Sequence, residues 1–102
     1  MNAVGIIEVF GLTAAIVAAD AACKAANVTI EAIDNNKPAN ADKLLVPVLI
    51  MVKLKGSISD IEVAIKAAEK AANKITSVNS KTIIPKIDNS IDFLIKKSCI
   101  NK

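Results

Sequence analysis

Hydrophobic and polar positions along the first third of the chain switch between a strand pattern and a helix pattern. The apolar, β-branched run 3–9 closes at Phe10-Gly11 and predicts a strand. Residues 12–26 are rich in alanine and carry apolar side chains at helical spacing, which predicts a helix with one buried face. The expected members of that face are Leu12, Ile16, Ala19, Cys23 and Ala26. Residues 28–33 return to alternation and predict a second strand.

The pattern then resumes after a polar segment. Residues 34–43 are dense in Asp, Asn, Lys and Pro, which predicts a loop. Residues 44–54 predict a third strand with Pro47 near its start, at an edge or bulge position, because proline cannot donate a hydrogen bond to a neighbouring strand.

A second helix and a fourth strand follow. Ser59 and Glu62 have the spacing of a capping box and predict the start of the helix. Its expected apolar stripe is Ile58, Ile61, Ile65, Ala68, Ala72 and Ile75. Residues 81–84 predict the fourth strand, which Pro85 ends, and residues 87–97 predict a short C-terminal helix.

The order strand, helix, strand thus occurs twice, and the two halves share a motif. Lys24-Ala25-Ala26-Asn27 closes the first helix, and Lys70-Ala71-Ala72-Asn73 lies near the end of the second. Two such halves predict one α+β domain over residues 1–102, with its core at about 3–86 and a C-terminal helix and tail at 87–102. The expected architecture is related to the ferredoxin-like fold, a four-stranded antiparallel sheet with both main helices on one face.

Composition then restricts the chemistry. The chain is 53% hydrophobic and has no histidine, so catalytic triads and metal sites that need histidine are excluded within one chain. The remaining candidates for an enzyme are Asp20 or Asp34 as acid or base and Cys23 as nucleophile. Cys23, in an alanine-rich helix, is expected to be a small buried residue, and no base is placed to activate it. We therefore predict no enzyme, no cofactor and no metal.

The charge pattern argues against several kinds of partner. The net charge of +3 comes from thirteen lysines, and there is no arginine for bidentate phosphate or guanine recognition. The chain has only two aromatic residues that could stack on nucleic-acid bases, so nucleic acid is not an expected partner. The longest uncharged apolar run, 44–52, is too short to span a membrane, and no signal peptide is evident. A cytoplasmic protein without a membrane partner is expected.

Several segments together resemble one known family. Residues 3–12, Ala-Val-Gly-Ile-Ile-Glu-Val-Phe-Gly-Leu, and residues 18–28, which include Asp20 and the Lys-Ala-Ala-Asn motif, are similar to the opening and first helix of the bacterial microcompartment (BMC) shell domain. Lys55-Gly56-Ser57-Ile58 resembles that family's Arg-Gly-Asp-Val segment, and Ile83-Ile84-Pro85-Lys86 its Val-Ile-Pro-Arg segment. The resemblance runs from about residue 3 to residue 90.

The resemblance implies a cyclic homohexamer with a pore on its six-fold axis, and hexamers that tile edge to edge into a shell around enzymes. It implies a structural protein of the microcompartment shell whose pore passes small metabolites, with other shell proteins and encapsulated enzymes as further partners. Lys24, Asn27 and Lys86 match the family's residues at the hexamer edge. There the Lys24 stem would lie along a neighbouring hexamer and its ammonium would meet carbonyl oxygens.

The family's glycine-containing pore loop is absent, and residues 35–42 stand in its place. The candidate pore-lining residues are Asn35, Asn36, Lys37, Pro38, Ala39 and Asn40. The charges of segment 34–43 cancel, which favours selection by bore and by asparagine hydrogen bonds. Two alternatives stay open: the segment folds aside and leaves the axis to other residues, or the chain is a ferredoxin-like trimeric signalling or ligand-binding module with 34–43 as its effector loop.

Overall fold

Strands and helices follow one another in the order that the hydrophobic pattern predicts. A computed structural model describes residues 3–36 and 49–86 of the chain. Within those ranges the elements are β1 (Ala3–Phe10), α1 (Leu12–Ala25), β2 (Thr29–Asn36), β3 (Leu49–Gly56), α2 (Ile58–Asn73) and β4 (Val78–Ile84). The predicted C-terminal helix 87–97 and the predicted strand residues 44–48 lie outside the described residues.

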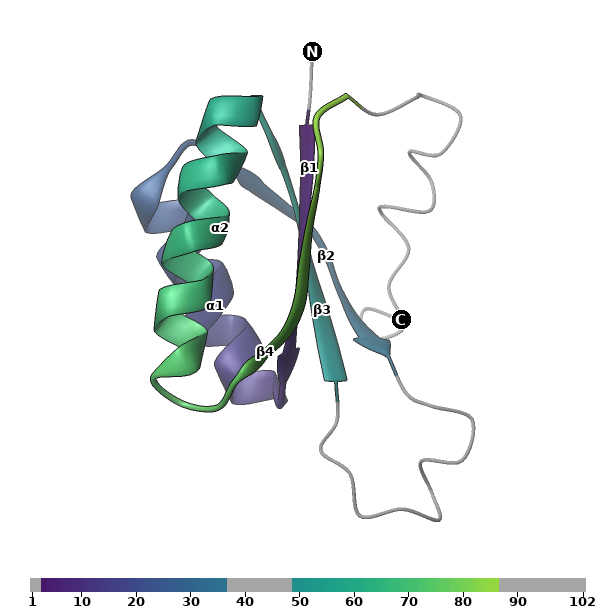
Figure 1. Cartoon of the computed structure of the whole chain (residues 1–102), viewed down its shortest axis with the longest axis vertical. Helices are drawn as coiled ribbons and strands as arrows, with labels where there is room; N and C mark the ends of the chain where they lie inside the picture. Colours follow the sequence, from purple (N-terminus) through teal and green to yellow (C-terminus); the bar gives the residue numbers. More distant parts are fainter. Residues whose placement is uncertain (1–2, 37–48, 87–102) are drawn as a thin grey trace.

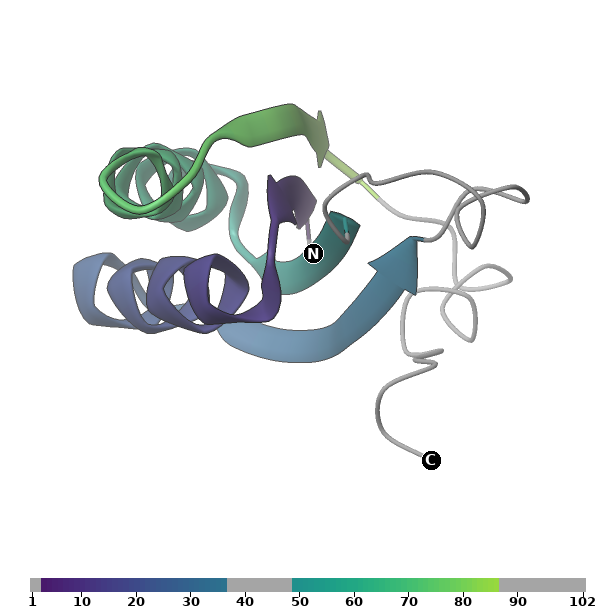
Figure 2. The ribbon, with the colours of Figure 1, turned by 90° about the horizontal axis from the view of Figure 1, so that it is seen from below.

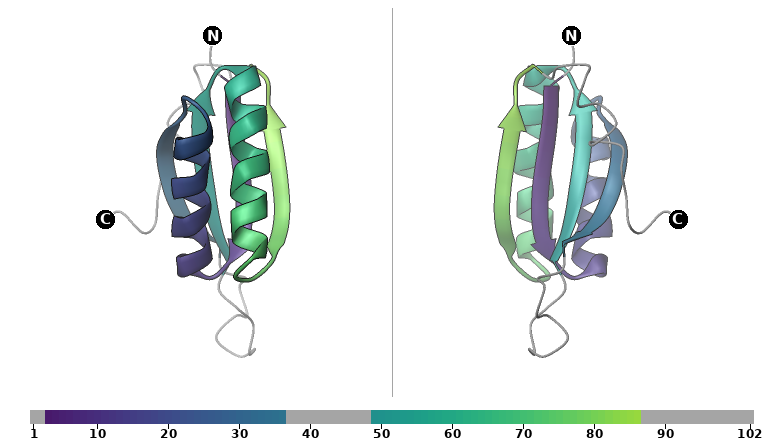
Figure 3. Two further views of the ribbon diagram at one scale, coloured as in Figure 1. Left: turned by 90° about the vertical axis from the view of Figure 1, so that its left-hand side faces the viewer. Right: turned by 90° about the vertical axis from the view of Figure 1, so that its right-hand side faces the viewer.

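The four strands form one sheet in the order β2-β3-β1-β4, and every neighbouring pair is antiparallel (Figure 1). Seen along the strands, both helices lie on the same side of the sheet (Figure 2). Helix α1 lies over the β2 side of the sheet and α2 over the β4 side (Figure 3). This arrangement confirms the predicted α+β class and the predicted four-stranded antiparallel sheet with two main helices.

The core fills the space between the sheet and the helices. Alternate side chains of the central strands point into it, among them Ile7 of β1 and Leu54 of β3, and Ile61 and Ile65 of α2 meet them there. Gly5 allows the closest approach: a Cβ atom at this position would lie 2.9 Å from Cγ2 of Ile61 and 3.0 Å from Cδ1 of Ile65. Helix α2 therefore rests directly on the backbone of β1.

Helix α1 buries a different face from the one predicted. Its buried residues are Ala14, Ala15, Ala18, Ala19 and Ala22. Leu12 is 48% exposed and Ile16 54% exposed, and Cys23 is exposed as well. The prediction that these larger side chains form the core face, and that Cys23 is buried, was therefore wrong. The methyl side chains of the alanines let α1 lie close to the sheet and to α2. Because protein interiors are close-packed, the space left between these elements is too narrow for the side chains of Leu or Ile.

Helix α2 follows its predicted stripe in the middle but not at its ends. Ile61, Ile65, Ala68 and Ala72 are buried as predicted, with Ala64 added to them. Ile58 and Ile75, at the two ends of the predicted stripe, are exposed. The N-cap is Ser57 instead of Ser59, since the Oγ of Ser57 accepts a hydrogen bond from the backbone N–H of Asp60 at 3.2 Å.

Two strands are longer than predicted. β2 continues through Asn36 because its last three residues pair with Met51, Ile50 and Leu49 of β3, so the predicted loop does not begin at Asp34. Backbone pairing supplies these hydrogen bonds whatever the side chains are, which is why polar residues did not end the strand. β4 begins at Val78, three residues before the predicted start.

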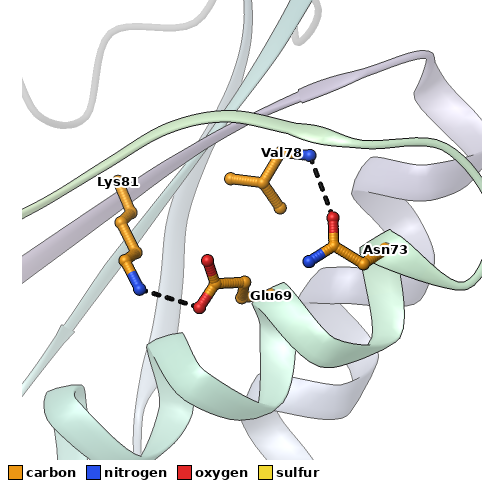
Figure 4. Close-up of polar contacts among 4 residues, drawn as sticks. All are labelled: Glu69, Asn73, Val78 and Lys81. Atoms are coloured by element: carbon orange, nitrogen blue, oxygen red, sulfur yellow. Dashed lines mark hydrogen bonds and ion pairs between the residues drawn. The ribbon is translucent and has the colours of Figure 1, made fainter.

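Two side chains of α2 form polar contacts with the first half of β4 (Figure 4). The backbone N–H of Val78 donates to Oδ1 of Asn73 at 3.2 Å. The ammonium of Lys81 lies 2.7 Å from Oε1 of Glu69. These two contacts fix the turn between α2 and the edge strand β4.

Candidate assembly surfaces

The strand register separates the domain into two ends. Thr29 pairs with Lys55, Ala3 with Gly56 and Val4 with Ile84, so these residues mark one end, called here the Gly56 end. At the other end, called the Asn36 end, Asn36 pairs with Leu49 and Leu49 with Phe10. Because the chain leaves β2 at Asn36 and enters β3 at Leu49, the connection between these strands starts and finishes at the Asn36 end.

The three predicted hexamer-edge residues lie at the Gly56 end, Lys24 and Asn27 before β2 and Lys86 after the opposite edge strand, β4. Lys24 lies in the last turn of α1, Asn27 follows that helix, and Lys86 follows the end of β4; all three are exposed. Gly56 supports this arrangement, since a Cβ atom there would lie 3.1 Å from the carbonyl oxygen of Asn27 and 3.1 Å from Cγ1 of Val28. The turn that carries Asn27 is thus held directly against the end of β3.

The Lys24 ammonium has a partner within its own helix. It lies 2.8 Å from Oδ2 of Asp20, one turn earlier, and both side chains are largely exposed. The hydrogen bond to Asp20 and its negative charge raise the pKa of Lys24, and the slight desolvation opposes them. Lys24 is therefore a fully charged, solvent-facing cation whose carboxylate partner lies beside it.

The Asn36 end carries part of the predicted pore segment. Asn35 and Asn36 are not loop residues but the last two residues of β2, where they pair with Ile50 and Leu49. Lys37, Pro38, Ala39 and Asn40, the other predicted pore residues, lie outside the described residues.

The helix-free face of the sheet carries several charged side chains, of which only Asp34 was a candidate functional residue from the sequence. The ammonium of Lys53 lies 3.7 Å from Oδ2 of Asp34, and that of Lys55 lies 3.8 Å from Oε1 of Glu31. On the other half of this face, Oε1 of Glu8 accepts hydrogen bonds from the Asn79 and Ser80 side chains, which belong to β4. The signal was present in the sequence as Lys53 and Lys55 at alternate positions of β3, a period typical of one strand face.

The residues considered for catalysis do not form one site. Asp20 and Cys23 lie on α1, whereas Asp34 lies on the helix-free face of the sheet beside Lys53. Within residues 3–36 and 49–86 no three His, Cys, Asp or Glu side chains gather where they could hold a metal ion. None of the helices in those ranges has the length and apolar content needed to cross a membrane.

The chain matches one protein-family model and is similar to known microcompartment and carboxysome proteins. The BMC domain model matches residues 3–87. The chain is 30% identical to the bacterial microcompartment shell protein PduA of Citrobacter freundii over 96 residues, which cover 94% of this chain and 94% of that protein. The chain is also 30% identical to PduA of Salmonella typhimurium, and the match covers 94% of this chain and 93% of that protein. The carboxysome assembly protein CcmO of Synechococcus elongatus is also 30% identical, and this chain spans 31% of its length.

A solved structure shares the fold. The crystal structure of a microcompartment protein from Desulfitobacterium hafniense superposes with a TM-score of 0.73 at 24% sequence identity. The match covers 94% of this chain and about half, 47%, of the other. The domain match, the relatives and the shared fold agree with the resemblance inferred from the sequence motifs. The chain therefore belongs to the BMC-domain family of bacterial microcompartment shell proteins.

Proposed function

We propose that this chain is a structural protein of a microcompartment shell that forms cyclic hexamers, and that the hexamers tile into a sheet with a pore for small metabolites in each ring. Family membership supports the structural shell role. The observation that carries the finer proposal is the separation of the two predicted surfaces. The edge candidates gather at the Gly56 end, and the connection that replaces the family's pore loop joins the sheet at the Asn36 end.

This separation suits a ring. If the Asn36 ends of six subunits point toward a common axis, their Gly56 ends point outward. Lys24, Asn27 and Lys86 then lie on the perimeter, where two rings meet. Each perimeter ammonium would exchange its contact with Asp20 for oxygens of the neighbouring ring, with its apolar stem lying along that surface.

The same orientation assigns the pore to the Asn36 end. Asn35 and Asn36 would approach the axis first, and residues 37–40 would complete the lining. Six copies of each side chain would then face one another, so the proposed selection acts through bore and asparagine hydrogen bonds.

Native mass spectrometry and electron microscopy of the purified chain test the two levels of assembly separately. We expect a hexamer in solution and ordered sheets at high concentration. Lys24→Ala should keep the hexamer and lose the sheets, because Lys24 lies on the proposed perimeter. The matched control is Lys70→Ala, which changes the first lysine of the other Lys-Ala-Ala-Asn motif, on α2. It should retain both hexamers and sheets.

The outcomes are distinct. A monomer or a trimer for the unaltered chain contradicts the ring, and a trimer favours the signalling or ligand-binding alternative. Hexamers whose sheets survive Lys24→Ala, or fail equally with Lys70→Ala, contradict the edge assignment alone.

A further inference from the structure

The side of the domain formed by α1 and β2 exposes several aliphatic side chains. Sγ of Cys23 lies 4.0 Å from the carbonyl oxygen of Val28, the residue before β2, so the side of α1 that carries Cys23 lies toward the start of that strand. Leu12 and Ile16 lie on that same side by helical spacing and are about half exposed. Ile30, on the edge strand β2, is 42% exposed. Ile30 pairs with Leu54, a core residue, so its side chain lies on the helix-covered face of the sheet.

The opposite side of the domain, formed by α2 and β4, contains a groove. Its volume is about 290 Å³, and it is lined by Glu62, Ile65, Lys66, Lys81 and Ile83. Ile65 is almost fully buried and Ile83 is partly buried, so the two isoleucines form an apolar floor. Charged side chains of α2 and β4 form the rim.

The exposed isoleucine and the groove belong to the same row of the sheet. Ile30 pairs with Leu54, Leu54 with Gly5, and Gly5 with Ile83. Ile30 and Ile83 therefore lie at the same distance from the Asn36 end, on the same face, at the two outer edges of the sheet. In a cyclic ring each subunit joins one side to the opposite side of the next subunit, and contacts form between points equally far from the axis.

We propose that Ile30 of one subunit inserts into the α2–β4 groove of the next subunit, against Ile65 and Ile83. This inference rests on the proposed ring and names the contact that closes it. The occupant of the groove is a second copy of this chain. The exposed side chain of Ile30 and the floor of the groove are both apolar, and both lie in the same row and on the same face of the sheet. Leu12 and Ile16 extend the apolar surface of the same side toward the axis and would be covered in the same interface.

The first test compares two variants with the same kind of change. Ile30→Thr keeps a β-branched side chain in the strand and removes apolar surface. Val63→Thr also replaces a β-branched aliphatic side chain with threonine, with one carbon fewer lost, at a residue that is 50% exposed on α2 and does not line the groove. We expect Ile30→Thr to raise the concentration at which half of the chain is hexameric by about tenfold or more, since six apolar contacts are weakened at once. Val63→Thr should leave that concentration unchanged.

The second test detects the contact directly. In a Cys23→Ser, Cys99→Ser background, Ile30→Cys combined with Lys66→Cys should give a ladder of oligomers up to the hexamer after treatment with a short bis-maleimide. Either cysteine alone should give no ladder. Efficient dimer formation by Ile30→Cys alone would show a two-fold contact between equal surfaces and overturn the proposal.

Failure of this inference is separable from failure of the proposed function. If the unaltered chain forms no hexamer, both fail. If it forms hexamers that Ile30→Thr leaves as stable as the unaltered ring, or that the two threonine variants weaken equally, only the assigned contact is wrong.

Discussion

Adding one methyl group at Gly5 should destabilise the domain measurably. Gly5 lies in the central strand β1 under α2, and Gly5→Ala would place Cβ 2.9 Å from Cγ2 of Ile61 and 3.0 Å from both Cδ1 and Cγ1 of Ile65. Normal carbon–carbon contacts are about 3.5–4.0 Å, so the helix or both isoleucines must move by several tenths of an ångström.

The expected cost follows from the surroundings of this contact. Ile61 is fully buried and cannot turn away into solvent, whereas Ile65, although only 2% exposed, borders the α2–β4 groove and can give way only in that direction. Overpacking of this kind costs about 1–3 kcal/mol. Alanine recovers about 0.5–1 kcal/mol, because glycine loses more backbone freedom on folding. We expect a net loss of about 0.5–2 kcal/mol, or roughly 2–15 °C in Tm for a domain of this size.

Urea denaturation at one fixed protein concentration is the suitable assay, because assembly raises the apparent stability of each subunit. Ile65→Val removes Cδ1, one of the two Ile65 atoms that the new methyl would meet at 3.0 Å, and keeps the other, Cγ1, whereas Ile61→Val keeps the Cγ2 atom that clashes. In double-mutant cycles with Gly5→Ala, Ile65→Val should therefore show a favourable coupling of about 0.5–1.5 kcal/mol, and Ile61→Val a smaller one.

Two results would refute this reasoning. A Gly5→Ala variant as stable as the unaltered chain would mean that α2 shifts without cost. Equal coupling with both valine variants would mean that the stress is spread over the whole helix instead of acting at Cδ1 of Ile65.

Three other contacts give predictions of different size. Ser57→Ala should cost about 1 kcal/mol of unfolding free energy in urea denaturation, because it removes the N-cap of α2, whereas Ser59→Ala should cost much less. Lys53→Met should cost about 1–3 kcal/mol of unfolding free energy by the same method, because Lys53 is buried beside Asp34. Lys81→Met removes the lysine of a half-exposed ion pair and should cost about 0–1 kcal/mol. Equal losses for the two variants would contradict the role of burial. Asp20→Asn should lower the pKa of Lys24 toward its ordinary value in an NMR titration. Because folding raises the pKa of Lys24, the contribution of this ion pair to stability is present below pH 10.5 and is lost as the pH rises through the pKa of the folded state.

The sequence was sufficient for the order of elements because each has a clear period. The apolar, β-branched run of β1 and the helical spacing of Ile61, Ile65 and Ala68 are enough to predict a strand and a buried helix face. Lys24, Asn27 and Lys86 became edge candidates through the resemblance of their local motifs to the BMC family, and the three residues lie at one end of the domain.

Errors arose where two patterns competed. In α1 the positions of Leu12, Ile16 and Cys23 and the positions of the alanines are both helical faces, and hydrophobicity alone favoured the larger side chains. Alanine occupies the buried face because α1 packs closely against the sheet and α2, and this closeness is a property of the tertiary structure that the local pattern does not contain. Likewise Asp34, Asn35 and Asn36 have low strand propensity, but pairing with β3 overrides it.

The alanine face of α1 also determines how the domain opens. Burying a methyl group contributes far less than burying an isoleucine side chain, so α1 is held by many small contacts, whereas Ile61 and Ile65 anchor α2. Local opening requires less free energy where little apolar surface is buried. The amide hydrogens of α1 should therefore exchange with solvent before those of α2. Helix α1 also carries Lys24 and the exposed Leu12 and Ile16, so of the two helices in residues 3–36 and 49–86 the less protected one is the one that assembly would cover.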